Sequence, residues 1–115
     1  MNSKQLKDRT KRFAVDVICL CREFPATLDG QVVGGQLIRS GTSVGANYRA
    51  SCRARSRAEW KAKLGVDEEE ADETLFWLEV SVEAELLPEP RVRALLKEAD
   101  ELTAIFVASL KTAKE

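Results

Sequence analysis

The chain has 115 residues, of which 44% are hydrophobic and 32% charged, and its formal net charge at pH 7 is -1. This length and balance are typical of one globular domain, residues 1–115, and exclude a disordered chain. The sequence contains no histidine, which excludes Ser-His and Cys-His nucleophile pairs and the Glu-x-x-His ligands of di-iron helical bundles. We therefore expect a protein without a catalytic site.

Neither a membrane span nor a metal centre is expected. No stretch approaches the ~20 consecutive apolar residues of a spanning helix, and the polar, basic start is unlike a secretory signal, so we expect a cytoplasmic protein. The three cysteines, Cys19, Cys21 and Cys52, are odd in number and lack paired C-x-x-C spacing. This excludes a disulfide framework and a zinc site, and we expect three small buried hydrophobic residues and no cofactor.

The first half of the chain predicts two helices. Apolar residues at steps of three and four form the first stripe, which Pro25 ends: Leu6, Thr10, Phe13, Val17, Leu20 and Phe24. After a connection to about Gly30, a stripe of smaller residues follows: Val33, Leu37, Ser40, Val44, Asn47 and Ser51. Each interspersed glycine costs a helix about 1 kcal/mol relative to alanine, so close packing must hold this helix, with a kink near Gly41.

The second half predicts two more helices. Ser56 and Glu59 match a capping box, in which the serine caps the amide three residues on and the glutamate reaches back. The third stripe is Trp60, Leu64, Asp67, Ala71, Leu75 with Thr74, Leu78 and Val82, running towards Leu86, with Phe76 and Trp77 beside it. Beyond Pro88 and Pro90 comes the fourth: Val92, Leu95, Ala99, Leu102, Phe106, Ser109 and Ala113. Short links between four such segments predict an all-α, antiparallel up-down-up-down four-helix bundle.

The charges are divided unevenly along the chain. Residues 1–63 hold 13 Lys and Arg against 5 Asp and Glu, whereas residues 64–115 hold 5 against 14. Six cations surround the junction of the second and third predicted helices: Arg49, Arg53, Arg55, Arg57, Lys61 and Lys63. Such a cluster is suited to phosphate groups, and a closed ring of subunits would make it multivalent. The alternative is that it neutralises the acidic helices, within the subunit or across an interface.

Polar residues beside the second and third stripes have two possible interpretations. Arg39 and Asn47 lie on or beside the second stripe and Glu70 and Glu73 beside the third, so we expect Arg39 to pair with one of these glutamates in a partly buried network. The alternative is that all four extend into solvent.

The acidic run from Asp67 lacks the glycine turn of a calcium loop and is interpreted as a solvated face. Tyr48 either stacks on a base or packs in the core.

Several segments in order resemble one family closely: F-x-x-x-V near the start, Phe24-Pro25, Gln36 to Ser40, Thr42 to Tyr48 and Glu73 to Leu78. Over roughly residues 10–87 the chain resembles bacterial four-helix-bundle proteins encoded in intervening sequences of large-subunit ribosomal RNA genes. The accessory protein of diversity-generating retroelements is a relative. The resemblance implies a non-enzymatic homopentameric ring of bundles. In the retroelement branch it also implies a basic surface that binds nucleic acid and a reverse transcriptase.

From the residues and the resemblance together, we expect a homo-oligomeric binding or scaffold protein. Its basic helix ends would engage RNA, DNA or a nucleic-acid enzyme such as a reverse transcriptase. The alternative is a protein–protein adaptor that does not bind nucleic acid.

Overall fold

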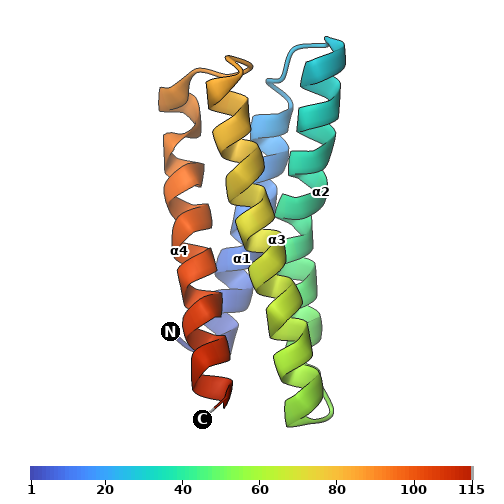
Figure 1. The fold of residues 1–115 in the computed structure, drawn as a ribbon, viewed down its shortest axis with the longest axis vertical. Coiled ribbons are helices and arrows are strands. Elements are labelled where there is room, and N and C mark those ends of the chain that lie inside the picture. Colours follow the sequence, from blue (N-terminus) through green and yellow to red (C-terminus); the bar gives the residue numbers. More distant parts are fainter. Residues whose placement is uncertain (115) are drawn as a thin grey trace.

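Four α-helices account for most of residues 1–114, which are the residues that the computed structural model describes: α1 (Ser3–Cys21), α2 (Leu28–Ser51), α3 (Arg57–Glu83) and α4 (Glu89–Lys114). They stand side by side along an axis of 45 Å, each running opposite to the one before it (Figure 1). The predicted all-α four-helix bundle is confirmed.

Side-chain caps fix where the first three helices begin. Asn2 and Gln5 form a full capping box at α1, and the Thr27 hydroxyl accepts a hydrogen bond from the Gly30 amide at α2. At α3, the Ser56 hydroxyl accepts a hydrogen bond of 3.0 Å from the Glu59 amide, as predicted. The Glu59 carboxylate, however, accepts from the amide of Arg55 rather than that of Ser56. Only the serine half of the expected capping box is therefore formed there.

Helix α1 ends at Cys21, earlier than the predicted end next to Pro25. The residue before a proline is sterically disfavoured in the helical region, so the chain leaves the helix before Phe24. The Phe24 ring instead folds back over α2, where a Cβ added at Gly34 would lie 3.4 Å from it. Phe24 thus still packs against the core, although it does so from the loop.

Two glycines allow α1 and α2 to approach closely. A Cβ at Gly41 would lie 2.7 Å from a methyl group of Val17, and one at Gly45 would lie 3.0 Å from the carbonyl oxygen of Thr10. Real Cβ atoms need more room than this, so a larger residue would push the helices apart. Close packing therefore holds α2 together, as expected, and the helix is continuous through Gly41.

The core runs the length of the bundle and is built from the predicted stripes. Its largest fully buried apolar side chains are Phe13, Phe106, Leu20, Leu37, Leu64, Leu78 and Leu102. In the second half of α3, Leu75 and Val82 are half-buried rather than buried as predicted, because Thr74, which the stripe also included, and Ser81 take the buried positions. Each hydroxyl donates to the carbonyl four residues earlier, which satisfies it inside the core.

The prediction that all three cysteines are buried is wrong. Cys19 and Cys52 are exposed, and Cys21 is half-buried with its sulfur 3.6 Å from the Gly34 carbonyl. Cys19 falls between the inward positions Val17 and Leu20, so the helical turn places it on the outer face. Burial raises the pKa of the Cys21 thiol to about 11, which keeps it protonated near neutral pH.

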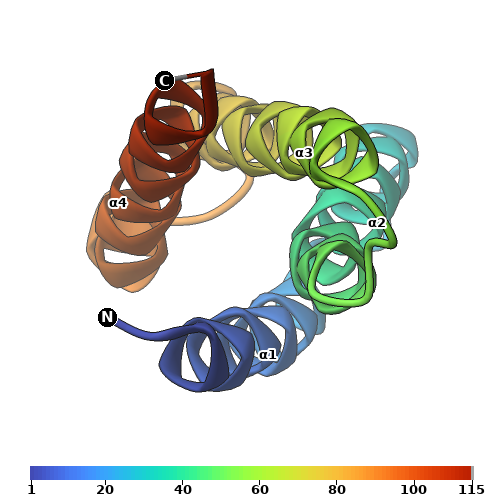
Figure 2. The ribbon, with the colours of Figure 1, turned by 90° about the horizontal axis from the view of Figure 1, so that it is seen from below.

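Helices α1 and α4 form the least tightly packed pair of neighbours in the bundle, and seen from below their ribbons approach each other less closely, along a seam, than those of the other neighbouring helices (Figure 2). Ion pairs bridge this seam: Arg9 binds Glu98 at 2.6 Å and Glu101 at 3.3 Å, and Arg91 binds Glu23. Both termini lie at the same end of the bundle as the α2–α3 connection (Figure 1). Within residues 1–114, every helix is too short or too polar to cross a membrane.

Candidate nucleic-acid interface

The six predicted cations all lie at one end of the bundle, around the α2–α3 connection at the bottom of Figure 1. Arg49 stands on the last turn of α2, two arginines occupy the connection, and the other three cations stand on the first turns of α3. The four arginines are exposed, whereas Lys61 and Lys63 are half-buried. The turn between two helices thus brings the cluster together, as the sequence predicted.

Acidic side chains of the same chain do not neutralise this cluster. Within the part of the chain that the structure describes, none of the ion pairs includes any of the six cations. The acidic residues of α3 and α4 that form ion pairs bind Arg9, Arg39 and Arg93 instead. The charges of the four arginines and Lys61 are therefore available to a partner outside the chain, whereas the charge of Lys63 also acts on the nearby Asp67.

Arg57 also has an architectural contact. Its guanidinium Nη2 donates to the backbone carbonyl of Ala113 at 2.7 Å, which ties the start of α3 to the end of α4. The last carbonyls of a helix lack partners within it and carry partial negative charge, so a cation there is favourable. Replacing Arg57 would thus change packing as well as surface charge.

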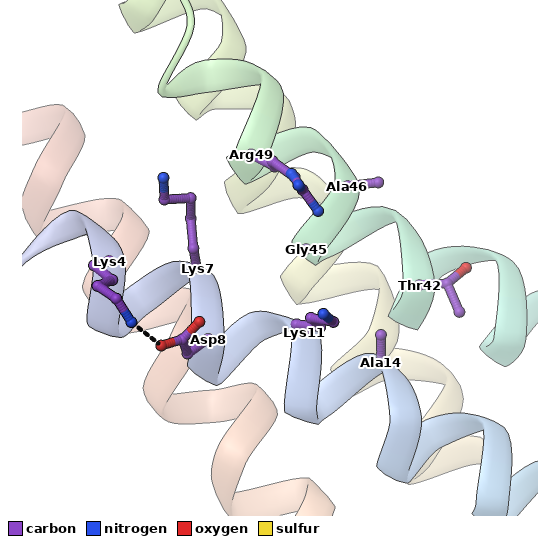
Figure 3. Close-up of a pocket in the computed structure, with 9 residues that line it drawn as sticks. All are labelled: Lys4, Lys7, Asp8, Lys11, Ala14, Thr42, Gly45, Ala46 and Arg49. Atoms are coloured by element: carbon purple, nitrogen blue, oxygen red, sulfur yellow. Dashed lines mark hydrogen bonds and ion pairs between the residues drawn. The ribbon is translucent and has the colours of Figure 1, made fainter.

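A groove of about 560 Å³ between α1 and α2 extends this basic surface (Figure 3). Lys4, Lys7 and Lys11 line it from α1, and Arg49 lines it from α2. Asp8 is its one acidic residue and pairs with Lys4 at 3.1 Å. We call the six predicted cations together with these three lysines the basic end.

Sequence reasoning missed the three lysines of α1. They are separated from Arg49 by about 40 residues of sequence, and only the antiparallel packing of α1 on α2 places them together. A signal was nevertheless present, because positions 4, 7 and 11 repeat at steps of three and four and so share one helical face.

Tyr48 belongs to the core and not to the surface. Its side chain is buried, and its ring centroid lies 5.8 Å from that of Phe106. Burial also raises the pKa of its hydroxyl. Tyr48 is therefore not placed to stack on a base.

The family model of the 23S rRNA-intervening sequence proteins matches residues 3–108 of the chain. The chain belongs to this family. A crystal structure of a protein with unknown function from the S23 ribosomal protein family of Bacteroides thetaiotaomicron VPI-5482, at 1.70 Å resolution, is similar to it with a TM-score of 0.85 and 30% sequence identity. That alignment covers 96% of this chain and 99% of the other. No curated protein matches the chain.

The predicted family resemblance is thereby confirmed, and the matched range is wider than the segments that carried it. It includes every residue of the basic end. Neither the family description nor the name of the similar structure states a ligand or an oligomeric state. The function of this intervening-sequence protein therefore has to be inferred from its own surface.

Beneath the basic end lies a buried carboxyl group. Asp67 is fully buried, so it does not belong to the solvated acidic face predicted for this run. Its Oδ2 accepts a hydrogen bond from the Ser51 hydroxyl at 2.7 Å, while its Oδ1 has no protein partner. Burial raises the pKa of Asp67 to about 6, opposed by the Ser51 hydrogen bond and the nearby charge of Lys63.

Arg39 lies between Glu70 and Glu73, the two glutamates proposed as its partners. Its guanidinium is 3.4 Å from a carboxylate oxygen of Glu70 and also binds Glu73, which links α2 to α3. The Arg39 side chain is 48% exposed, so the network lies at the surface rather than partly inside the core. Asn47 stands eight residues farther along α2, where its backbone carbonyl accepts a hydrogen bond from Ser51. The structure thus brings three of the four residues together.

Proposed function

We propose that this intervening-sequence protein is a non-enzymatic, homo-oligomeric scaffold that binds the phosphate backbone of RNA or DNA through its basic end. The observation that carries the proposal is that the six predicted cations gather at one end and form no ion pair within the described residues. A cation without an acidic partner releases counterions when it meets a phosphate, and this release drives nucleic-acid binding.

Self-association, which the family resemblance suggests as a pentamer, is part of this proposal. Large apolar side chains remain on the surface of the single chain: Leu28 is 80% exposed, and Val32 and Phe76 are each more than half exposed. Subunit contacts that cover these groups would remove apolar surface from water. A ring would also repeat the basic end, so that several weak contacts act together.

The test compares two variants that lose the same charge at different places. Arg53→Gln combined with Arg55→Gln removes two cations of the basic end and leaves the architectural Arg57 contact intact. Arg22→Gln combined with Lys97→Gln removes two exposed cations elsewhere. Fluorescence anisotropy of a labelled RNA or DNA oligonucleotide at low salt measures affinity. We expect the first variant to bind at least about tenfold more weakly than the second.

Two results would contradict the proposal. Wild-type protein that binds neither RNA nor DNA at low salt would leave the adaptor function in its place. Equal losses for the two variants would show that the basic end has no special role. Light scattering on both variants separates a binding role from an interface role, because loss of the oligomer only in the Arg53/Arg55 variant would place these arginines between subunits.

A further inference from the structure

We propose that the groove between α1 and α2 binds the phosphodiester backbone of a nucleic-acid strand and reads its charge without reading its sequence. This inference rests on the proposed function and extends it to residues of α1. It assigns to Lys7, Lys11 and Arg49 the contacts to the backbone, and to the small residues between them the space that the backbone occupies.

The cations of the groove are spaced along a line. From Lys4 to Lys11 the helix rises about 10 Å, and the three lysines stand on successive turns of one face. Arg49 stands on the opposite wall, so a strand that lies in the groove meets positive charge from both helices (Figure 3). The Asp8 carboxylate forms an ion pair with Lys4, whereas Lys7 and Lys11 form no ion pair within residues 1–114. These two lysines are therefore the ones with charge to offer.

The space for the backbone comes from small residues at the helix contact. Ala14 on α1 and Gly45 and Ala46 on α2 line the groove between the cations. Gly45 lets α2 approach the backbone of α1 at Thr10, which keeps the two basic walls close. An arginine on the wall opposite the lysines can donate two parallel hydrogen bonds to one phosphate while the lysines neutralise its neighbours.

The lining of the groove lacks two kinds of group that read bases. None of its residues is aromatic, and none carries an amide side chain, so both base stacking and the usual adenine contacts are missing. The one hydroxyl, that of Thr42, already donates to the carbonyl of Ile38 at 2.7 Å. The lysines and Arg49 remain, and a backbone that lies in the groove presents them with phosphate, which is common to single strands and duplexes and carries no sequence information. Cations also bind the O6 and N7 of guanine, so strands that contain guanine are needed to test this claim.

The first test removes the two unpaired lysines. Lys7→Gln combined with Lys11→Gln should weaken binding about tenfold at low salt and make the salt dependence shallower. The slope of log K against log salt should fall by about 1.4 for a single strand or about 1.8 for a duplex, and comparing the two probes shows which one uses the groove. Single strands of uridine, adenosine or cytidine alone, and a strand in which guanosine alternates with uridine, should bind within about twofold of one another.

The second test places a negative charge in the groove without disturbing the helices. Ala46 is exposed, so both Ala46→Glu and its neutral match Ala46→Gln are compatible with the helix. Both side chains fill part of the groove, but Ala46→Glu should weaken binding more than Ala46→Gln, because only the glutamate also repels phosphate. Equal losses for the two would overturn the role assigned to charge. Circular dichroism of each variant verifies that the helices are intact.

The outcomes separate this inference from the function on which it rests. If the Lys7/Lys11 variant binds like wild type while the Arg53/Arg55 variant binds weakly, the groove is not the site, although the six cations around the α2–α3 connection still are. A preference of more than about tenfold among the three homopolymers and the guanosine-containing strand would overturn the claim that the groove ignores sequence. Wild-type protein that binds no nucleic acid would remove the proposed function itself.

Discussion

Replacing Asp67 with asparagine should remove a pH-dependent component of the protein's stability. The Asp67 carboxyl is fully buried between α2 and α3, with one oxygen bound to Ser51 and the other without a protein partner. Burial raises its pKa from the ordinary value of 3.8 to about 6 in the folded protein, with Lys63 as the cation that opposes this rise. The titratable Tyr48 hydroxyl, whose own pKa is also raised by burial, stays neutral over this range.

The direction and size follow from which state holds the proton. Between pH 4 and about 6 the folded chain keeps the Asp67 proton while the unfolded chain has released it. Raising the pH across this window therefore favours unfolding, and the free energy of unfolding falls. A difference of about two pKa units corresponds to about 3 kcal/mol, at 1.36 kcal/mol per unit. The full stabilising effect of the protonated group is present below pH 4 and is lost above about pH 6.

Urea unfolding followed by circular dichroism gives the free energy of unfolding of wild type and Asp67→Asn at intervals from pH 4 to pH 8. Protein concentration is held constant, because association of subunits would otherwise change the apparent stability. Other carboxyl groups contribute equally to both proteins, so the difference between the two curves isolates Asp67. We expect this difference to change by about 3 kcal/mol in favour of the asparagine variant between pH 4 and pH 7. Parallel curves would refute the reasoning.

Further predictions concern packing and local conformation. Gly41→Ala should lower the free energy of unfolding by about 1–2 kcal/mol, because the added methyl group meets Val17. An unchanged free energy of unfolding in urea would show that α1 and α2 can move apart without cost, which would contradict this prediction. Glu85→Gly should raise the melting temperature, since Glu85 has a φ of 57° that costs a residue with a side chain about 1 kcal/mol; a lower melting temperature would contradict this. Arg39→Leu should lower stability by less than about 1 kcal/mol, because the ion pairs it removes are exposed; a loss of several kcal/mol would contradict this placement.

The helices were predictable because their determinants are local. Apolar residues at steps of three and four identify the buried face of each segment, and the cap at Ser56 depends on a residue only three positions away. The early end of α1 shows where local rules become insufficient. Pro25 ends the helix, but the turn at which the chain leaves it depends on Phe24 packing back over Gly34 in a neighbouring helix.

The candidate site was predictable only in part, for a similar reason. The six cations around the α2–α3 connection are close in sequence and must be close in space. The lysines of α1 join them only through the packing of α1 on α2. This packing requires a residue without a side chain at Gly45. Asp67 was misread because its acidic neighbours suggested a solvated face, although its place on the apolar stripe already indicated burial. Helical position was the better guide than local composition.

The most direct measurement of the central claim is the salt dependence of nucleic-acid affinity for the wild-type protein. Anisotropy titrations of one labelled duplex, from about 50 to about 200 mM salt, give the slope of log K against log salt. Binding through the basic end predicts a straight line with a slope of about -0.9 for each phosphate contacted, and a shallower line for Arg53→Gln with Arg55→Gln. A slope near zero, or one that this double substitution leaves unchanged, would contradict the claim that this protein holds nucleic acid by the charges at one end of its bundle.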